Sequence, residues 1–197
     1  MITAFNPEIG DCLIVMLKKA DTSEHETKEN ITRLFVGEET VGYNFFNCQK
    51  DLGLETAGQV FLNEKQIAYL NQRLKEVGFL EELVLDDRPK IVVGYVESCI
   101  PHPDSDHLSI TQTKVSDTKT LQIVCGAKNV AAGQKVVVAL PEALMPDGTP
   151  IWPGSLRGAE SFGMLCSARE LHLPDAPQVK GILVLPEDAV VGESFFK

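Results

Sequence analysis

Long apolar runs, paired cysteines and basic side chains are all scarce in this sequence of 197 residues. No stretch approaches the roughly 18 consecutive apolar residues that span a membrane. The first seven residues also lack the basic and apolar regions of a secretory signal. Hydrophobic residues still make up 44% of the chain, enough for packed cores. We therefore expect a cytoplasmic, globular protein with no membrane partner.

The five cysteines include no Cys-x-x-Cys pair, and an odd number cannot pair completely within one chain. Cys125 and Cys166 each follow apolar residues, which is typical of buried thiols. The pattern favours reduced cysteines of a cytosolic protein. It argues against a disulfide framework and against a metal site made of cysteines.

Basic residues are outnumbered by acidic ones, 18 against 28, for a net charge of -10. Proteins that bind nucleic acids usually gain affinity by neutralising phosphates with Lys and Arg. Residues 1–89 carry 9 basic and 16 acidic side chains (net -7), and residues 90–197 carry 9 and 12 (net -3). Any nucleic-acid site must therefore be a local patch.

The first part of the chain has the pattern of a small α+β domain. Residues 11–17 form an apolar run, and residues 31–36 and 40–46 are rich in β-branched and aromatic side chains, so three strands are expected. The polar residues 21–30 are expected to form a loop that holds a solvated His25. Nothing in this part looks catalytic.

A helix is predicted after these strands. Ile67, Leu70, Leu74 and Val77 are spaced by three, four and three residues, which places them on one stripe of an α-helix. Asn63 is a suitable N-cap, and Gly78 is a suitable stop. The turn-prone residues 86–89 end with a proline. We therefore predict one domain over residues 1–88 and a second over residues 89–197.

The second part reads as short strands separated by Gly, Pro, Asn and Asp. This pattern predicts an all-β barrel or sandwich. The expected strands are residues 91–96, 108–115, 120–124, 135–140 and 181–185.

Three motifs stand in this second part. His102 begins a His-Pro-x-x-Asp-x-Leu stretch, Cys125 begins Cys-Gly-Ala-Lys-Asn, and Leu156-Arg157-Gly158 precedes the Ser-Phe-Gly-Met-Leu-Cys-Ser of residues 161–167. The first stretch contains two histidines and two aspartates, so a metal site is one interpretation. A turn that precedes a strand is the other, and we favour it. No metal or cofactor is predicted.

In this order the three motifs resemble the tRNA-binding domain of phenylalanyl-tRNA synthetase β-chains, methionyl-tRNA synthetase carboxy-terminal extensions and endothelial monocyte-activating polypeptide type II. The resemblance implies an OB-fold (oligonucleotide-binding) barrel over about 105 residues. The first part, with its Val41-Gly42-Tyr43-Asn44 and single helix, is similar to the additional amino-terminal domain of the YtpR family. Class I synthetase signatures are absent, so aminoacylation is not expected.

Two loop residues after the strand at Cys125 are candidates for RNA contact. Lys128 can neutralise a phosphate, and Asn129 can hydrogen-bond a base edge or a sugar hydroxyl. An alternative for Asn129 is that it only supplies a left-handed turn. Arg157 can bind a phosphate bidentately, although an ion pair with Glu160 is an alternative.

The resemblance adds Ser161 and Met164, which match positions of the family implicated in tRNA contact. The residues alone would place Met164 in the core. His107 stands where the family commonly has lysine, so one phosphate contact is expected to be weaker. His172 stands where the family usually has glycine, so that turn is expected to differ.

The favoured function is non-catalytic binding of tRNA or another structured RNA. One alternative is a translation-associated protein-interaction adaptor, whose acidic first domain docks a basic protein partner and whose barrel binds RNA weakly. Another is a hydrolase that uses Cys125 or Cys166 with a histidine. Exposed strand edges also permit a homodimer.

Overall fold

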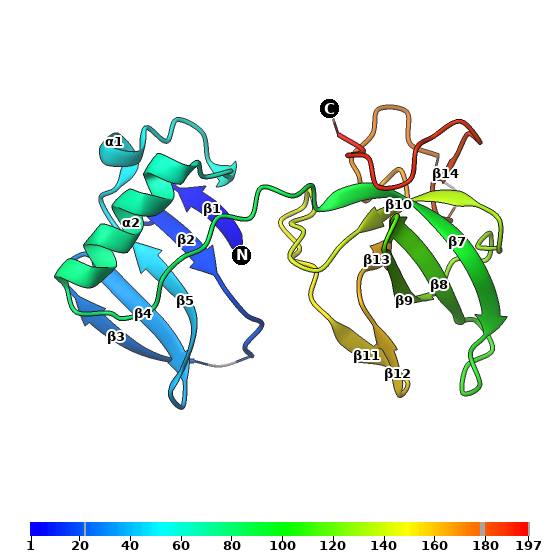
Figure 1. Cartoon of the computed structure of the whole chain (residues 1–197), viewed down its shortest axis with the longest axis horizontal. Helices are drawn as coiled ribbons and strands as arrows, with labels where there is room; N and C mark the ends of the chain where they lie inside the picture. Colours follow the sequence, from blue (N-terminus) through cyan, green and yellow to red (C-terminus); the bar gives the residue numbers. More distant parts are fainter. Residues whose placement is uncertain (22, 178–179, 197) are drawn as a thin grey trace. The chain divides into compact units, whose positions relative to one another are not determined.

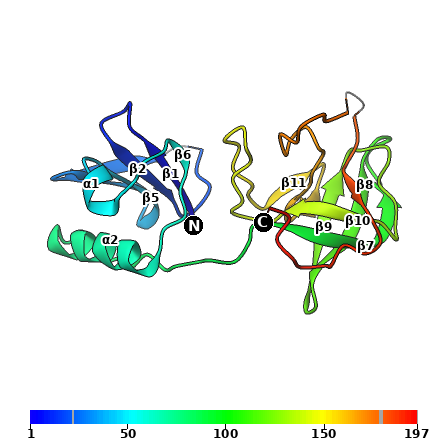
Figure 2. The same cartoon turned by 90° about the horizontal axis from the view of Figure 1, so that it is seen from above.

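Two separate units, Met1–Arg88 and Pro89–Lys197, make up the computed structural model, which describes residues 1–21, 23–177 and 180–196 (Figures 1 and 2). The hydrophobic clusters of the described residues do not mix: one lies in the first unit and two lie in the second. No helix among these residues is long and apolar enough to cross a membrane. Each unit is described below by itself.

The amino-terminal unit is an antiparallel sheet with one long helix on one face, as Figures 1 and 2 show. Its strand order is β3-β4-β5-β2-β1-β6. The elements are β1 (Ile2–Asn6), β2 (Cys12–Met16), β3 (Glu24–Lys28), β4 (Ile31–Val36), β5 (Glu39–Phe45), α1 (Gln49–Leu52), β6 (Gly58–Gln59) and α2 (Glu64–Glu76).

Helix α2 begins where the sequence predicts. The Asn63 side chain accepts a hydrogen bond from the backbone N–H of Gln66 at 3.0 Å, and the Gln66 side chain accepts one from the N–H of Asn63 at 2.8 Å. This capping box satisfies two helix N–H groups that have no partner within the helix. Ile67, Leu70 and Leu74 are buried against the sheet, which confirms the predicted stripe.

The predicted loop over residues 21–30 is wrong, because Glu24–Lys28 forms strand β3. The strand pairs with β4 through its backbone, with Glu24 opposite Phe35 and Lys28 opposite Ile31. Four of its five side chains are exposed, so it buries no apolar face and shows no alternation in the sequence. His25 lies on this strand and is exposed.

A charged network joins the segment after α2 to the sheet. Glu81 accepts hydrogen bonds from the hydroxyls of Thr40 and Tyr43, the latter at 2.7 Å, and pairs with Arg33 at 3.0 Å. Burial alone would raise the pKa of Glu81, but these hydrogen bonds and the positive charge of Arg33 outweigh burial and hold it at about 2. Burial, with the hydrogen bond to Glu81, raises the pKa of Tyr43.

This network predicts acid sensitivity of the first unit. The pKa of Glu81 is lower in the folded state (about 2) than the roughly 4.3 of an unfolded chain, so its contribution is present above pH 4.3 and is lost as the pH falls through 2. Urea unfolding followed by circular dichroism between pH 7 and 2 should show this loss. Glu81→Gln should be less stable at pH 7 and should lose less stability on acidification; an equal pH dependence in both proteins would contradict the assignment.

The carboxy-terminal unit contains a curled antiparallel sheet in the order β13-β10-β7-β8-β9, with β14 paired to β10 and a separate hairpin of β11 and β12. The curl brings β13 beside β9, so the two ends of the strand order approach each other. The strands are β7 (Ile91–Pro101), β8 (Ser109–Ser116), β9 (Lys119–Cys125), β10 (Lys135–Ala139), β11 (Gly154–Leu156), β12 (Ala159–Ser161), β13 (Met164–Leu165) and β14 (Val184–Leu185).

Strand β10 is buried on both faces. Val136 and Val138 belong to one hydrophobic cluster, and Val137 and Ala139 belong to the other. All four side chains are fully buried. This explains why residues 135–140 read as a continuous apolar run without alternation. Strand β10 is therefore the centre of the unit.

Each of the five predicted strands in this unit has a counterpart, but the boundaries differ. Strand β7 continues from the predicted end at Val96 to Pro101, across an irregularity between Val96 and Ser98. The predicted strand over residues 181–185 is reduced to Val184–Leu185. The hairpin of β11 and β12 is not in the prediction.

Candidate nucleic-acid interface

Loops from three parts of the second unit meet around the end of β9. Arg157, at the tip of the β11–β12 hairpin, donates a hydrogen bond to the carbonyl of Asp104 at 3.3 Å. Asp104 lies in the loop between β7 and β8, and Leu108 lies at the end of that loop. Leu108 is beside Gly126, which follows β9, because a Cβ atom placed on Gly126 would be 3.4 Å from Cδ2 of Leu108. The structure therefore brings the three sequence motifs together.

A tight turn presents Arg157. Leu156 is paired with Ala159, so Arg157 and Gly158 form the two-residue connection of the hairpin. Both have positive φ, 47° and 84°. Turns of this kind fit the twist of a hairpin but require left-handed backbone at both positions. Arg157 therefore adopts a backbone conformation that most side chains avoid, and its side chain projects from the tip of the hairpin.

His102 connects two of these loops, and it was not among the residues that the sequence predicted for the RNA site. Its side chain is 3% exposed. Nδ1 accepts a hydrogen bond from the N–H of Asp104 at 3.0 Å, and Nε2 lies 3.1 Å from the carbonyl oxygen of Leu156. A carbonyl can only accept, so Nε2 carries the proton and the imidazole is neutral. His102 thus joins the β7–β8 loop to the hairpin.

Four predicted site residues are exposed on these loops: Lys128, Asn129, Arg157 and His107. Arg157 has no ion pair with Glu160 in the described part of the chain, so that alternative is not supported. The His107 side chain is 58% exposed and contacts Asp106 at 2.9 Å. This hydrogen bond lowers the pKa of the Asp106 carboxyl, which keeps a negative charge beside the imidazole.

Asn129 has a structural partner. Its side-chain N–H donates to the carbonyl of Ile182 at 3.0 Å, and its carbonyl accepts from the N–H of Ile182 at 2.9 Å. Its φ is not positive, so the left-handed-turn alternative is wrong. The amide leaves only one N–H and one lone pair for a ligand. RNA contact by Asn129 stays a prediction.

Ser161 and Met164 are packed inside the unit more than the resemblance implies. Ser161 is 5% exposed. Its hydroxyl accepts from the N–H of Val124 at 3.1 Å and donates to the carbonyl of Gly163 at 3.3 Å. Met164 is half-buried against the cluster around Val137. Contact of either residue with RNA stays a prediction, and for the buried Ser161 it requires local rearrangement.

Two cysteines of this unit, Cys125 and Cys166, are poor nucleophiles. Burial raises the pKa of Cys166 to about 12 and raises that of Cys125 as well. All five cysteines are free, and four are buried. Among the described residues, no group of three or more His, Cys, Asp or Glu side chains is placed to hold a metal ion.

His172 adopts left-handed backbone, with φ of 50°. Glycine adopts this conformation without strain, whereas other residues avoid it. The turn keeps the conformation that glycine favours although the sequence has histidine there. The expectation of a differently shaped turn is therefore not supported by the backbone.

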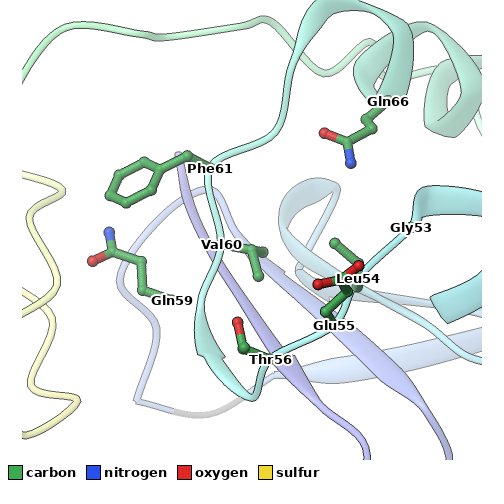
Figure 3. A pocket seen from close by; sticks show the side chains of 8 residues that line it. All are labelled: Gly53, Leu54, Glu55, Thr56, Gln59, Val60, Phe61 and Gln66. Atoms are coloured by element: carbon green, nitrogen blue, oxygen red, sulfur yellow. The ribbon is translucent and has the colours of Figure 1, made fainter.

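A separate open pocket of about 350 Å³ lies in the amino-terminal unit, between β6 and the start of α2 (Figure 3). Polar side chains of Glu55, Thr56 and Gln59 line it, together with Val60 and Phe61. None of the described residues that line it is basic. Its chemistry therefore differs from that of the loops around Arg157.

Comparison with known proteins gives matches to both units. A family model described as "Putative tRNA binding domain" matches residues 91–194, and one described as "Domain of unknown function (DUF4479)" matches residues 18–86. The "Putative tRNA-binding protein YtpR" of Bacillus subtilis is 45% identical over 196 residues, which cover 97% of each chain.

Two further matches are confined to part of the chain. The phenylalanine–tRNA ligase beta subunit of Lactiplantibacillus plantarum is 49% identical over 111 residues, 54% of this chain and 14% of the relative. The crystal structure of the C-terminal domain of Plasmodium vivax p43 is 31% identical, covers 55% of this chain and 61% of that chain, and has a TM-score of 0.40.

Proposed function

The chain belongs to the tRNA-binding-domain family, and from this premise we propose that it is a non-catalytic protein that binds tRNA or another structured RNA. Residues 89–197 form the RNA-binding domain, an OB-fold barrel, and residues 1–88 form the amino-terminal domain of the YtpR type. The 45% identity along nearly the whole chain to a relative named as a tRNA-binding protein carries this proposal. We place its action in the cytoplasm.

The loops around Arg157 suit a small phosphate-binding patch. Lys128 and Arg157 are exposed cations on loops that meet, and the unit that carries them has a net charge of only -3. His107 adds a donor beside Asp106. Arg157 binds a phosphate through its planar fork, while Lys128 acts as a point charge. The barrel therefore reads the shape of the RNA backbone rather than its sequence.

A catalytic role is not supported by the side chains that would carry it. Raised thiol pKa values keep Cys125 and Cys166 protonated at neutral pH. His102 uses both ring nitrogens on backbone groups, so it has no free atom to serve as a base. This supports binding without chemistry.

Titration of labelled mixed tRNA with the purified chain, followed by anisotropy at low and physiological salt, tests the proposal. We expect micromolar or tighter binding that prefers tRNA to single-stranded DNA and weakens steeply with salt. Arg157→Ala and Lys128→Ala should each reduce the slope of log K against log salt by about 1 and weaken binding to all tRNAs alike.

Lys65→Ala on the exposed face of α2 is the matched control, because it removes one positive charge from the other unit. Equal slopes for Lys65→Ala and Arg157→Ala would overturn the assignment of the patch. Absence of tRNA binding at low salt would overturn the function itself.

A further inference from the structure

Strand β6 leaves one edge of the amino-terminal sheet open. The backbone N–H of Val60 donates to the carbonyl of Thr3 at 3.1 Å, and the Thr3 hydroxyl donates to the carbonyl of Val60 at 2.6 Å. Backbone groups alternate in direction along an extended strand. The N–H and carbonyl groups of Gln59 therefore face away from β1, toward the open edge.

The side chains at this edge are also unusual. Phe61 is 83% exposed, whereas Val60 packs against the hydrophobic cluster. Figure 3 shows the ring of Phe61 and the amide of Gln59 projecting together on the side opposite Val60. An aromatic ring left in water beside free backbone groups is characteristic of a recognition surface.

The polar side chains of the adjacent pocket have no internal partners. In the part of the chain that the structure describes, Glu55, Thr56 and Gln59 make no side-chain hydrogen bond or ion pair. Gln66, by contrast, is already engaged, since its amide donates to the carbonyl of Leu52 at 2.6 Å. A carboxylate, a hydroxyl and an amide are thus available in the pocket, and the amide of Gln59 projects on the same side as the exposed ring (Figure 3).

Charge identifies the kind of partner. The first 89 residues carry 9 basic and 16 acidic side chains, a net charge of -7, and no described basic residue lines the pocket. Phosphate groups are repelled by such a surface, whereas Lys and Arg side chains are attracted to it. A cation can lie over the Phe61 ring while the negative charge of Glu55, in the adjacent pocket, attracts it to this edge.

The opposite edge of the same sheet shows how an edge is protected. Strand β3 exposes charged side chains, and its Glu26 pairs with Lys28 at 3.3 Å. Charged side chains of this kind discourage the addition of another strand. The β6 edge carries an exposed aromatic residue instead, so the two edges differ in what they accept.

We propose that the β6 edge, residues 58–61, binds an extended basic peptide segment of another protein by strand addition, with a Lys or Arg of that segment held over the Phe61 ring and attracted by the negative charge of Glu55 in the adjacent pocket. The backbone of the peptide pairs with the outward-facing groups of Gln59 and continues alongside Phe61. This gives the amino-terminal unit a protein-binding activity that is separate from RNA binding by the second unit and does not depend on it.

The test uses the full chain and a fluorescent ten-residue peptide of alternating arginine and valine, titrated by anisotropy. The same peptide with N-methyl groups on alternate residues removes backbone pairing but keeps the charge, and a glutamate–valine peptide reverses the charge. Phe61→Ala and Glu55→Gln change the proposed contacts. Glu24→Gln removes the same charge from the other edge and is the matched control.

We expect Phe61→Ala and Glu55→Gln to weaken binding of the arginine peptide by about tenfold and about fivefold, and Glu24→Gln by less than about twofold. The N-methylated and glutamate peptides should not bind. All three variants should keep the tRNA affinity of the parent chain, because the changed side chains are exposed on the first unit.

Equal weakening by Glu55→Gln and Glu24→Gln would show non-specific charge attraction and overturn the proposal. Undiminished binding of the N-methylated peptide would exclude strand addition. Loss of tRNA affinity in Phe61→Ala would make this edge an RNA surface instead. Conversion of a dimer to a monomer by Phe61→Ala, with no peptide binding, would assign the edge to a second copy of the chain.

Discussion

His102→Asn is expected to weaken tRNA binding by about tenfold, whereas His102→Gln should weaken it by less than about threefold. Asparagine can replace Nδ1 as the acceptor for the N–H of Asp104, but it cannot reach Leu156. Glutamine can replace Nε2 as the donor to the carbonyl of Leu156. The two variants therefore break different halves of the same connection.

The two variants are expected to differ in tRNA affinity because the hydrogen bond from His102 to the carbonyl of Leu156 holds the hairpin that carries Arg157. Among the hydrogen bonds of the described residues, the 3.3 Å contact between Arg157 and Asp104 would then be the remaining link between the hairpin tip and the β7–β8 loop, while β12 stays attached to β9 through Gln122 and Glu160. A phosphate-binding side chain on a mobile support loses affinity through the entropy of ordering it. Anisotropy titration of tRNA with each variant measures the effect.

Thermal unfolding provides the control for this pair. Each substitution removes one buried hydrogen bond, which costs about 1–3 kcal/mol when its partner is left unsatisfied, so the two variants should lose similar stability. Similar stability with different affinity would establish His102 as a positioning residue. Equal affinity in both variants would reduce it to a core residue with no influence on Arg157.

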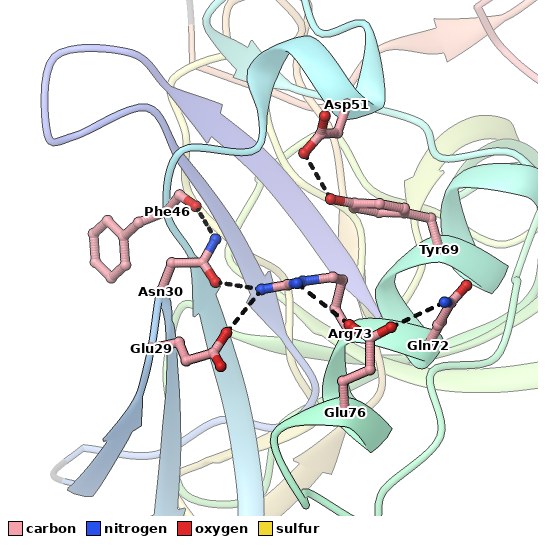
Figure 4. A network of polar contacts seen from close by, with 8 residues as sticks. All are labelled: Glu29, Asn30, Phe46, Asp51, Tyr69, Gln72, Arg73 and Glu76. Carbon is pink, nitrogen blue, oxygen red and sulfur yellow. Dashed lines mark hydrogen bonds and ion pairs between the residues drawn. The ribbon is translucent and has the colours of Figure 1, made fainter.

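Leu70→Ala is expected to unfold the amino-terminal unit at a lower urea concentration, with a loss of about 2–5 kcal/mol, and to leave tRNA affinity within about twofold. Leu70 is fully buried on α2 in the cluster of the first unit. The helix is also fixed by polar contacts at its surface, where Arg73 donates to Asn30 at 2.9 Å and Tyr69 donates to Asp51 at 2.7 Å (Figure 4).

Two signals separate the units in this experiment. The helices of the described residues all lie in the first unit, so circular dichroism at helix wavelengths follows it, while the single tryptophan, Trp152, reports on the second. Leu80→Ala is the matched control, because Leu80 is 96% exposed and its removal should change stability by less than about 0.5 kcal/mol. A parallel shift of the Trp152 transition in Leu70→Ala would contradict independent units.

The elements that sequence reasoning found bury an apolar face, although β1, which buries Ile2 and Phe5, was also missed. Helix α2 has a stripe and a cap, and β10 has a continuous apolar run, because both pack against other elements. Strand β3 was missed because it is held by backbone pairing with β4 and buries almost nothing. A strand without a buried face leaves no periodic signal in its side chains.

The candidate site, like the fold, could be predicted only in part from the sequence. Motif order located the loops of Lys128 and Arg157, but it could not separate exposed side chains from those with internal partners. Asn129 bonds Ile182 and His102 bonds Leu156, across separations of 53 and 54 residues that local sequence does not encode. Only the folded chain shows which polar groups remain available to a ligand.

The pairing of β7 with the last residues of the barrel has a consequence for synthesis on the ribosome. Val92 bridges Ser194, the N–H of Val93 donates to the carbonyl of Glu193, and the N–H of Phe195 donates to the carbonyl of Ile91. One edge of the start of β7 therefore lacks its partner until residues about a hundred positions later are translated, although β8 and β10 pair with the strand earlier. We expect the amino-terminal unit, which has its own hydrophobic cluster, to fold before that, so that nascent chains pass through a stage with one folded unit and an exposed, strand-rich segment open to chaperones.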